Sequence, residues 1–226
     1  SSHPALAQDD DDFDMFEEEF SEKAVPIADP LEPINRLMFN LNDFLYKAAI
    51  KPVAQGYKKV TPKPARISVR NFFGNLTAPI RYVNCVLQGK LNEANRELER
   101  FATNSTVGIL GLFDPAQEKF GLDPTDEDLG QTLGAHGIGN GLYIVWPLLG
   151  PSTVRDSLGR FGDRMFYPVT YMVDSPNALV AIAVARTTNS YSFRIKDYDA
   201  LLSDAIDPYA VIRNTYIQYR NQQINE

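Results

Sequence analysis

The feature that most constrains the fold of this chain is a capping side chain placed directly before a proline, at five positions. These pairs are Asp29-Pro30, Asp114-Pro115, Asp123-Pro124, Ser175-Pro176 and Asp207-Pro208. An Asp or Ser at a helix N-cap accepts hydrogen bonds from unpaired backbone N–H groups, and a proline in the first turn loses no intrahelical hydrogen bond. Each pair therefore predicts the start of a helix.

Helix ends are predicted at four glycines, because a residue without a Cβ atom readily takes the left-handed conformation that closes a helix. They are Gly74, Gly89, Gly108 and Gly134. Between these signals the sequence predicts helices near 64–73, 79–88, 91–106, 126–133, 153–166, 176–193, 197–204 and 208–222.

The strongest helical pattern covers residues 31–48, where apolar residues follow at steps of three or four, the period of an amphipathic helix. Asp29, Pro30 and Glu32 predict a capping box at its start. The opposite face carries Asn35, Arg36, Phe39, Asn40, Asn42 and Asp43. Amides outnumber full charges on this face, which in the simplest interpretation is a polar outer surface.

Two apolar stretches, 142–149 and 167–173, are candidates for short strands. Pro147 and Pro168 argue against a central position in a sheet, because proline cannot donate to the hydrogen-bond ladder. Sustained strand alternation is hard to find elsewhere in the sequence. The sequence therefore predicts an all-α fold, with one helical domain over residues 29–222.

The formal charge of −7 comes from the start of the chain. Residues 1–30 carry ten acidic side chains against Lys23 alone, which leaves 19 acidic and 21 basic side chains, or +2, for the rest. Like charges repel, so a disordered acidic tail is predicted rather than a cation-binding arm. Ala5-Leu6-Ala7 resembles a signal-peptidase site, so residues 1–28 are interpreted as a signal-peptide remnant followed by this tail.

The body of the chain lacks the concentrated basic surface of a nucleic-acid-binding protein, and we expect no nucleic-acid partner. Its longest apolar run, Leu142 to Leu149, is shorter than the ~18 residues that a membrane-spanning helix needs.

The sequence holds few residues suited to catalysis. Its two histidines are His3, in the acidic tail, and His136, in a glycine-rich turn without a Ser or Cys partner motif. It has no G-x-S-x-G elbow and no H-x-x-x-H or C-x-x-C pair, and the single Cys85 excludes an intrachain disulfide. We therefore expect no enzyme activity, no metal and no cofactor.

Two apolar segments near glycines are candidates for contact with a membrane interface, where Trp and Tyr place a polar tip at headgroup depth. Their residues are Ile109, Leu110, Leu112 and Phe113 in the first segment, and Leu142, Tyr143, Ile144, Val145, Trp146, Leu148 and Leu149 in the second. The alternative is burial in the protein core. The glycines at 134–141 do not fit a nucleotide-binding loop, which needs a strand before it and a helix after it.

Three arginines, Arg155, Arg160 and Arg164, fall in one predicted helix. A guanidinium group matches a lipid phosphate in a bidentate geometry, so contact with headgroups is one interpretation. Asp156 and Asp163 support the other, which is ordinary salt bridges on a solvated helix face.

Several motifs closely resemble those of the MlaA/VacJ family. They are Asp29-Pro30-Leu31-Glu32, Asn35-Arg36, Phe39-Asn40, Arg66 through Asn71-Phe72, Gly74-Asn75-Leu76, Pro79, Asn84, Leu87-Gln88-Gly89, Arg100-Phe101, Asn104, Gly130-Gln131-Thr132-Leu133-Gly134 with Gly137, Gly139 and Gly141, Gly150 to Asp156, and Asp207-Pro208-Tyr209 to Arg213 and Tyr216. The resemblance covers residues 29 to about 220, with the motifs in order.

The resemblance implies a ring-like helical protein with an amphipathic central channel, in the inner leaflet of the outer membrane of a Gram-negative bacterium. Phospholipids misplaced in the outer leaflet would pass through the channel and be handed to a soluble periplasmic carrier. Trimeric porins would be membrane partners. On this basis the expected channel residues are Asn35, Arg36, Phe39, Asn40, Arg70, Asn71, Arg155 and Asp156.

Members of that family are typically anchored by a lipidated N-terminal cysteine. The first cysteine here is Cys85, within a predicted helix, so we expect either an anchor outside this sequence or attachment through apolar surface alone. Two other functions stay open. One is a porin-associated structural protein that conducts no lipid, and the other is a lipid-active enzyme that depends on His136 or Ser152.

Overall fold

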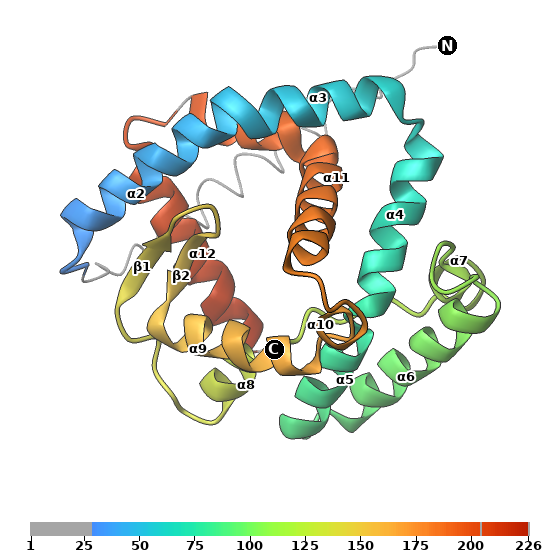
Figure 1. Ribbon diagram of the computed structural model, residues 1–226. Helices are drawn as coiled ribbons and strands as arrows, with labels where there is room; N and C mark the ends of the chain where they lie inside the picture. Colours follow the sequence, from blue (N-terminus) through green and yellow to red (C-terminus); the bar gives the residue numbers. More distant parts are fainter. Residues whose placement is uncertain (1–28, 204, 226) are drawn as a thin grey trace, which may run out of the picture. The chain divides into compact units, whose positions relative to one another are not determined.

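The computed structural model describes residues 29–203 and 205–225. Leu31–Glu226 forms one compact unit, distinct from Ser1–Pro30, and it contains all the elements below (Figure 1). The predicted tail and signal-peptide remnant, residues 1–28, lie outside the described residues.

Helices dominate this unit, as the sequence predicts. In chain order they are α2 (Glu32–Leu45), the π-helical turn η1 (Tyr46–Ile50), α3 (Lys51–Val60), α4 (Lys63–Leu76), α5 (Ala78–Leu87), α6 (Leu91–Thr106), α7 (Pro115–Phe120), α8 (Leu129–Ala135), α9 (Val154–Asp163), the 3-10 turn η2 (Arg164–Phe166), α10 (Val169–Met172), α11 (Pro176–Ser203) and α12 (Pro208–Asn225). The all-α prediction is confirmed apart from one small hairpin, and the ring-like channel stays a prediction.

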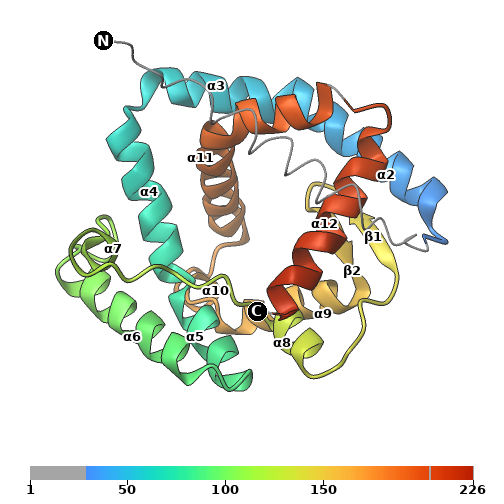
Figure 2. The ribbon, with the colours of Figure 1, turned by 180° about the vertical axis from the view of Figure 1, so that it is seen from behind.

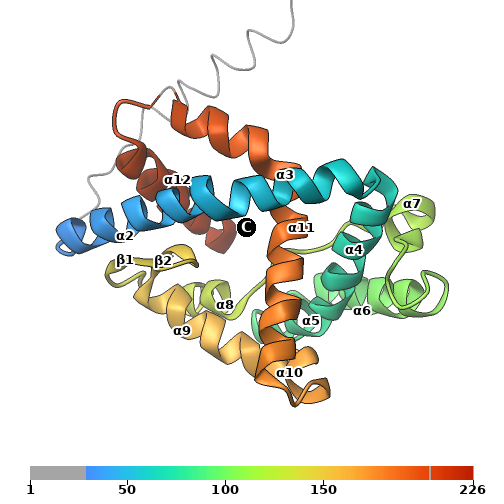
Figure 3. The ribbon, with the colours of Figure 1, turned by 45° about the horizontal axis from the view of Figure 1, so that its top comes forward.

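The helices pack pairwise rather than as one parallel bundle. α2, η1 and α3 follow one another from Glu32 to Val60, and α11 packs against α3 and α4 (Figure 3). α5 packs on α6, α8 on α9 and α12 on α8, as the view from behind also shows (Figure 2).

A two-stranded antiparallel hairpin lies between α2 and α12. Its strands are β1 (Tyr143–Trp146) and β2 (Gly150–Thr153), paired from Tyr143 opposite Thr153 to Trp146 opposite Gly150. β1 contacts α2, and β2 contacts α12. The strand predicted at 142–149 is thus confirmed in part, as β1. The strand predicted at 167–173 is wrong, because Pro168 has helical backbone angles and α10 follows it.

The first helix differs from the prediction at both ends. Leu31 is its N-cap, so the helix begins two residues after Asp29, the predicted cap. Glu32 instead pairs with Arg36, whose Nε lies 2.7 Å from a Glu32 carboxylate oxygen. The helix also does not end at residue 48. It continues through η1 into α3, which was not predicted, and Pro52 is accommodated in the first turn after the π-helical turn.

Other predicted starts and ends are partly confirmed. Asp114, Ser175 and Asp207 each accept a hydrogen bond from a backbone N–H three residues on, at the start of α7, α11 and α12. The start predicted at Asp123 is wrong, because Asp128 caps the following helix, α8. The two helices predicted at 176–193 and 197–204 are one continuous helix, α11.

The predicted helix ends are also partly confirmed. Gly89 follows α5 with a φ of 75°, as a closing glycine should. Gly74 and Gly134 instead lie inside α4 and α8.

Polar side chains fill much of the interior of this unit. Among the described residues, buried polar and charged side chains outnumber buried apolar ones, and many large apolar side chains are exposed. On α2 the exposed ones are Ile34, Leu37, Leu41 and Phe44. In the part of the chain that the structure describes, no helix combines the length and the apolar character needed to cross a bilayer.

Candidate functional site

Two asparagines on one face of α2 hold the edge of strand β1. Asn35 and Asn42 are seven residues apart, which is about two helical turns, so both face the hairpin. The buried Asn35 side chain donates to the Tyr143 carbonyl (3.0 Å) and accepts from the Val145 N–H (2.9 Å). The helix thus supplies the hydrogen-bond partners that a third strand would give.

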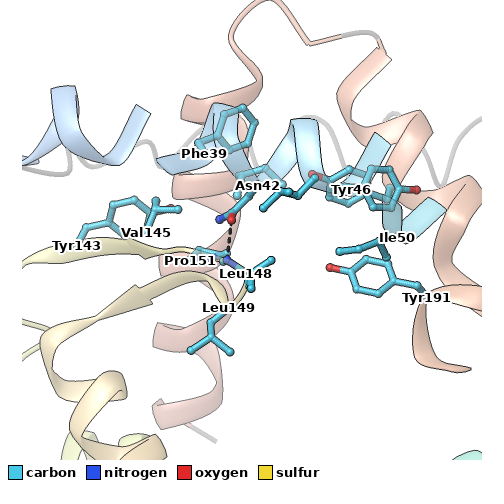
Figure 4. Close-up of a pocket in the computed structure, with 14 residues that line it drawn as sticks. Phe39, Asn42, Tyr46, Ile50, Tyr143, Val145, Leu148, Leu149, Pro151 and Tyr191 are labelled. Carbon is cyan, nitrogen blue, oxygen red and sulfur yellow. Dashed lines mark hydrogen bonds between the residues drawn. The ribbon is translucent and has the colours of Figure 1, made fainter. Parts of the chain in front are cut away.

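Asn42 repeats this arrangement at the hairpin turn. Its side chain donates to the Trp146 carbonyl (2.9 Å) and accepts from the Leu148 N–H (2.7 Å), the contact drawn in Figure 4. Leu148 has a φ of 63°, which is uncommon for a residue with a Cβ atom. The hydrogen bond from Leu148 to Asn42 therefore holds a turn that its own residue type does not favour.

Arg36 joins the start of α2 to the start of α12. Its guanidinium donates to both carboxylate oxygens of Asp207, at 3.0 and 2.7 Å, and lies 4.4 Å from the centroid of the Tyr209 ring. The hydrogen bonds from Arg36 lower the pKa of Asp207 to about 2. Asn40 and Asp43 lie beside this pair and help line a polar hollow of about 260 Å³.

An apolar cavity of about 270 Å³ lies where α2, η1, the hairpin, α11 and α12 meet (Figure 4). It is lined by Phe39, Asn42, Leu45, Tyr46, Ile50, Tyr143, Val145, Leu148, Leu149, Gly150, Pro151, Tyr191, Tyr198 and Ile212. Every lining residue is uncharged, and the Asn42 amide already hydrogen-bonds the hairpin. The cavity therefore suits an apolar ligand better than a polar one.

Three tyrosines stand together at the α11 side of this cavity. The Tyr46 ring lies 4.2 Å from the Tyr198 ring and 5.7 Å from the Tyr191 ring, measured between centroids. Burial raises the pKa of Tyr46 to about 12 and also raises the pKa of Tyr191 and Tyr198. All three hydroxyls are consequently protonated at neutral pH, and the Tyr46 hydroxyl donates toward the Ile195 carbonyl oxygen (3.5 Å) and an Asp199 carboxylate oxygen (3.4 Å).

Asp156 is the centre of a buried polar network that joins α8, α9 and α12. Its carboxylate accepts from Arg155 (2.9 Å), Arg220 (3.0 Å) and Tyr216 (2.7 Å), and Arg220 also binds Asp128. Burial alone would raise the pKa of Asp156, but the hydrogen bonds and charge of Arg220 lower it to about 2. The alternative prediction, that Asp156 forms a salt bridge on a solvated helix face, is therefore wrong, because α12 covers this face of α9.

Close helix contact explains two glycines near this network. A Cβ atom added to Gly159 of α9 would clash with the backbone nitrogen of Gly130 of α8. A Cβ atom on Gly130 would lie 2.7 Å from both Arg220 and Asp156. Only glycine lets α8 and α9 approach this closely.

The structure brings together part of the predicted channel set. Asn35, Arg36, Phe39 and Asn40 lie on α2, toward the hairpin and the start of α12. Arg155 and Asp156 are buried in the polar network on α9. Two further residues, Arg70 and Asn71, belong to α4, where the Arg70 guanidinium lies 5.1 Å from the Phe193 ring of α11. Lipid contact by this set stays a prediction.

The predicted membrane-interface residues divide by exposure. The exposed ones are Ile109, Leu110, Leu112, Phe113, Leu142, Trp146, Leu148 and Leu149. Tyr143 and Val145 are buried against α2, with Ile144 partly covered between them, as strand alternation requires. Tyr143 and Val145 are therefore core residues, which was the alternative to membrane contact. Membrane contact by the exposed residues stays a prediction.

Four residues that help build this site were not predicted from the sequence: Asn42, Tyr191, Tyr198 and Arg220. Tyr191 and Tyr198 are spaced seven residues apart, so they share a face of α11, and this spacing was the available signal. Asn42 was noted only as part of a polar face. Arg220 follows Tyr216 by four residues, which places the two side chains together over Asp156.

The residues considered for catalysis lie apart from the cavity lining. His136 is exposed, and its Nδ1 lies 2.8 Å from the Thr132 carbonyl oxygen. The Ser152 hydroxyl is buried 3.1 Å from the Ser157 hydroxyl. Within the described ranges, no group of three or more His, Cys, Asp or Glu side chains is placed to hold a metal ion.

Comparison with known proteins gives consistent results. The family model described as MlaA lipoprotein matches residues 27–223. The intermembrane phospholipid transport system lipoprotein MlaA of Escherichia coli (strain K12) is 34% identical over 194 residues, which cover 84% of this chain and 76% of that protein. The Haemophilus influenzae protein of the same name is 30% identical over 204 residues, covering 88% and 80%.

A solved structure from work on the structural basis for maintenance of bacterial outer membrane lipid asymmetry also matches this chain. Its TM-score is 0.78 at 32% sequence identity, and the match covers 88% of this chain and 100% of the other. The similarity thus extends over nearly all of Leu31–Glu226 in both sequence and fold.

Proposed function

The chain belongs to the MlaA lipoprotein family, and from that premise we propose that it is the outer-membrane component of an intermembrane phospholipid transport system. It lies in the inner leaflet of the outer membrane of a Gram-negative bacterium. There it removes phospholipids from the outer leaflet through an amphipathic channel and passes them to a periplasmic carrier, with a trimeric porin as its membrane partner. Its ligand is phospholipid, and it acts without a chemical step.

The exposed apolar stripe of α2 is the observation that carries this proposal. Ile34, Leu37, Leu41 and Phe44 repeat at steps of three and four on one face, and all are exposed. The face with Asn35 is instead buried. A soluble protein normally turns the apolar stripe of a helix inward, so this inversion is typical of a helix whose apolar face meets lipid.

Other described segments extend the same pattern. Leu110 and Phe113 are exposed in the loop after α6, and Leu148 and Leu149 are exposed at the hairpin turn. Large exposed apolar surfaces mark contact with membranes or partner proteins. The buried polar networks meanwhile hold the helices together, so that apolar side chains remain free to face lipid.

The direct test is the phospholipid content of detergent-purified protein, measured by extraction and mass spectrometry against a detergent blank. We expect phospholipid on the parent and less on a Leu37→Gln, Leu41→Gln variant, which breaks the apolar stripe. A Lys58→Gln, Lys59→Gln variant, altered on exposed polar positions of α3, serves as the control and should match the parent. Phospholipid no higher than the blank on any of the three would contradict lipid conduction and favour a purely structural porin-associated role.

A further inference from the structure

We propose that the apolar cavity between α2, η1, the hairpin and α11 binds a single acyl chain of a phospholipid. The inference deepens the proposed function, on which it rests, by assigning one part of the lipid to a defined group of side chains. It depends on the size, lining and opening of the cavity.

The size of the cavity sets the kind of ligand. At about 270 Å³ it is smaller than the ~300–1,000 Å³ of sites that enclose whole small molecules. A complete phospholipid does not fit, whereas one extended hydrocarbon segment does. The headgroup and the second chain then lie outside the cavity.

The chemistry of the lining favours hydrocarbon. Phe39, Leu45, Ile50, Val145 and Ile212 present only carbon and hydrogen from four different elements. No lining residue carries a charge, so a phosphate or an ammonium group would lose its hydration without gaining a partner of opposite charge.

The hairpin turn gives this cavity an apolar mouth. Leu148 and Leu149 line it and yet are largely exposed, at 68% and 69%. Leu148 is also held at a φ of 63° by its hydrogen bond to Asn42. The backbone at Leu148 thus places an apolar side chain at the mouth, where the glycine that this conformation favours would place none.

Two features of the opposite wall fit a ligand site. Tyr46 and Ile50 border the cavity from η1, and π-helical turns inside α-helices occur frequently at functional sites. Figure 4 shows Tyr191 reaching from α11 toward Ile50, with its hydroxyl directed into the cavity.

The test uses the full chain in detergent and a phosphatidylcholine that carries a photoreactive diazirine near the end of one acyl chain. After irradiation, peptide mass spectrometry locates the adducts. We expect them on peptides that contain Ile50, Leu148 or Tyr191. Adducts confined to the exposed apolar stripe of α2 and the loop after α6 would overturn the proposal.

A cavity-filling variant makes the test specific. Ile50→Phe places a larger side chain in the cavity, whereas Val53→Phe makes a similar change at an exposed position of α3. Each methylene kept out of an apolar site weakens binding about fourfold, so excluding two should lower cavity labelling by roughly tenfold or more. Val53→Phe should label like the parent, and equal labelling of Ile50→Phe would count against the site. If Ile50→Phe melts well below the parent, Ile212→Phe fills the same cavity from α12 and should lower cavity labelling in the same way.

A fatty-acid probe and the content of copurified phospholipid distinguish this inference from the proposed function. The same diazirine on a free fatty acid should label the cavity less than the phospholipid does, and labelling by the fatty acid alone would overturn the phospholipid assignment. Phospholipid that copurifies while the cavity stays unlabelled would refute this inference and leave the proposed function standing. Cavity labelling by added phospholipid, on protein that copurifies with none, would support the acyl-chain site and contradict lipid conduction.

Discussion

The side-chain oxygen of Asn42 accepts a hydrogen bond from the backbone N–H of Leu148 at 2.7 Å, across 106 residues of sequence. It fixes the hairpin turn to α2 beside the apolar cavity. Asn35 does the same for the middle of β1, so the amide face of α2 is a structural seam between helix and hairpin.

The first prediction separates structural from exposed asparagines of α2. Asn35→Leu should lower the free energy of unfolding by about 2–4 kcal/mol, because the Tyr143 carbonyl and the Val145 N–H each lose the buried hydrogen-bond partner that Asn35 supplies. Asn40→Leu, at an exposed position, should change it by less than about 0.5 kcal/mol. Denaturant titration in one detergent measures the free energy of unfolding of both variants. Equal decreases for Asn35→Leu and Asn40→Leu would show that the hydrogen bonds between Asn35 and the hairpin do not stabilise the fold.

The second prediction concerns Asp156. Asp156→Asn should destabilise the fold by about 3–5 kcal/mol, because the buried positive charges of Arg220 and Arg155 would lose the negative charge of Asp156. Glu118→Gln, which changes an exposed carboxylate on α7, is the control and should be nearly neutral. Thermal or denaturant unfolding at pH 7 gives the comparison.

The same carboxylate predicts a pH dependence. Its pKa is about 2 in the folded protein against an ordinary value of 3.8, so the unfolded chain takes up the proton first as the pH falls. The stabilisation from Asp156 is therefore complete well above pH 3.8 and is lost as the pH falls from there toward 2. In Asp156→Asn the loss over this interval should be smaller than in the parent. An unchanged slope would show that other groups account for the acid sensitivity.

The fourth prediction tests the close contact of α8 and α9. Gly159→Ala should destabilise the protein by about 1–3 kcal/mol, because its Cβ atom would meet the Gly130 backbone. Gly74→Ala provides the matched comparison, since a Cβ atom there meets nothing within 4 Å and Ala favours the helix by ~0.5–1 kcal/mol. Gly159→Ala should lower the melting temperature relative to the parent, and Gly74→Ala should raise it. A higher melting temperature for Gly159→Ala would contradict the close contact of α8 and α9.

The fifth prediction concerns the exposed loop after α6. Leu110→Lys should reduce flotation of the protein with phospholipid vesicles by roughly tenfold, because the bilayer contact loses a large apolar side chain. Gln117→Lys adds the same charge at an exposed polar position and should float like the parent. Equal flotation of the two variants would place this loop away from the bilayer.

Local signals in the sequence determined where most helices lie. Asp114, Ser175 and Asp207 cap their helices as predicted, because a cap depends on residues within one turn. The predicted helix 91–106 coincides with α6. The family, too, was recognisable from its ordered motifs, since these are properties of the sequence itself.

Only the tertiary structure decided what the polar residues do. Asn35 and Asn42 fitted an outer polar face, yet they bind the hairpin. Asp156 fitted either headgroup contact or a salt bridge on a solvated face, yet α12 covers it. The cavity likewise joins Tyr46 to Tyr191, which are far apart in the chain. Periodicity identifies a face of a helix, but it does not specify what that face meets. That choice depends on hydrogen bonds and packing between segments a hundred residues apart, which no local pattern encodes.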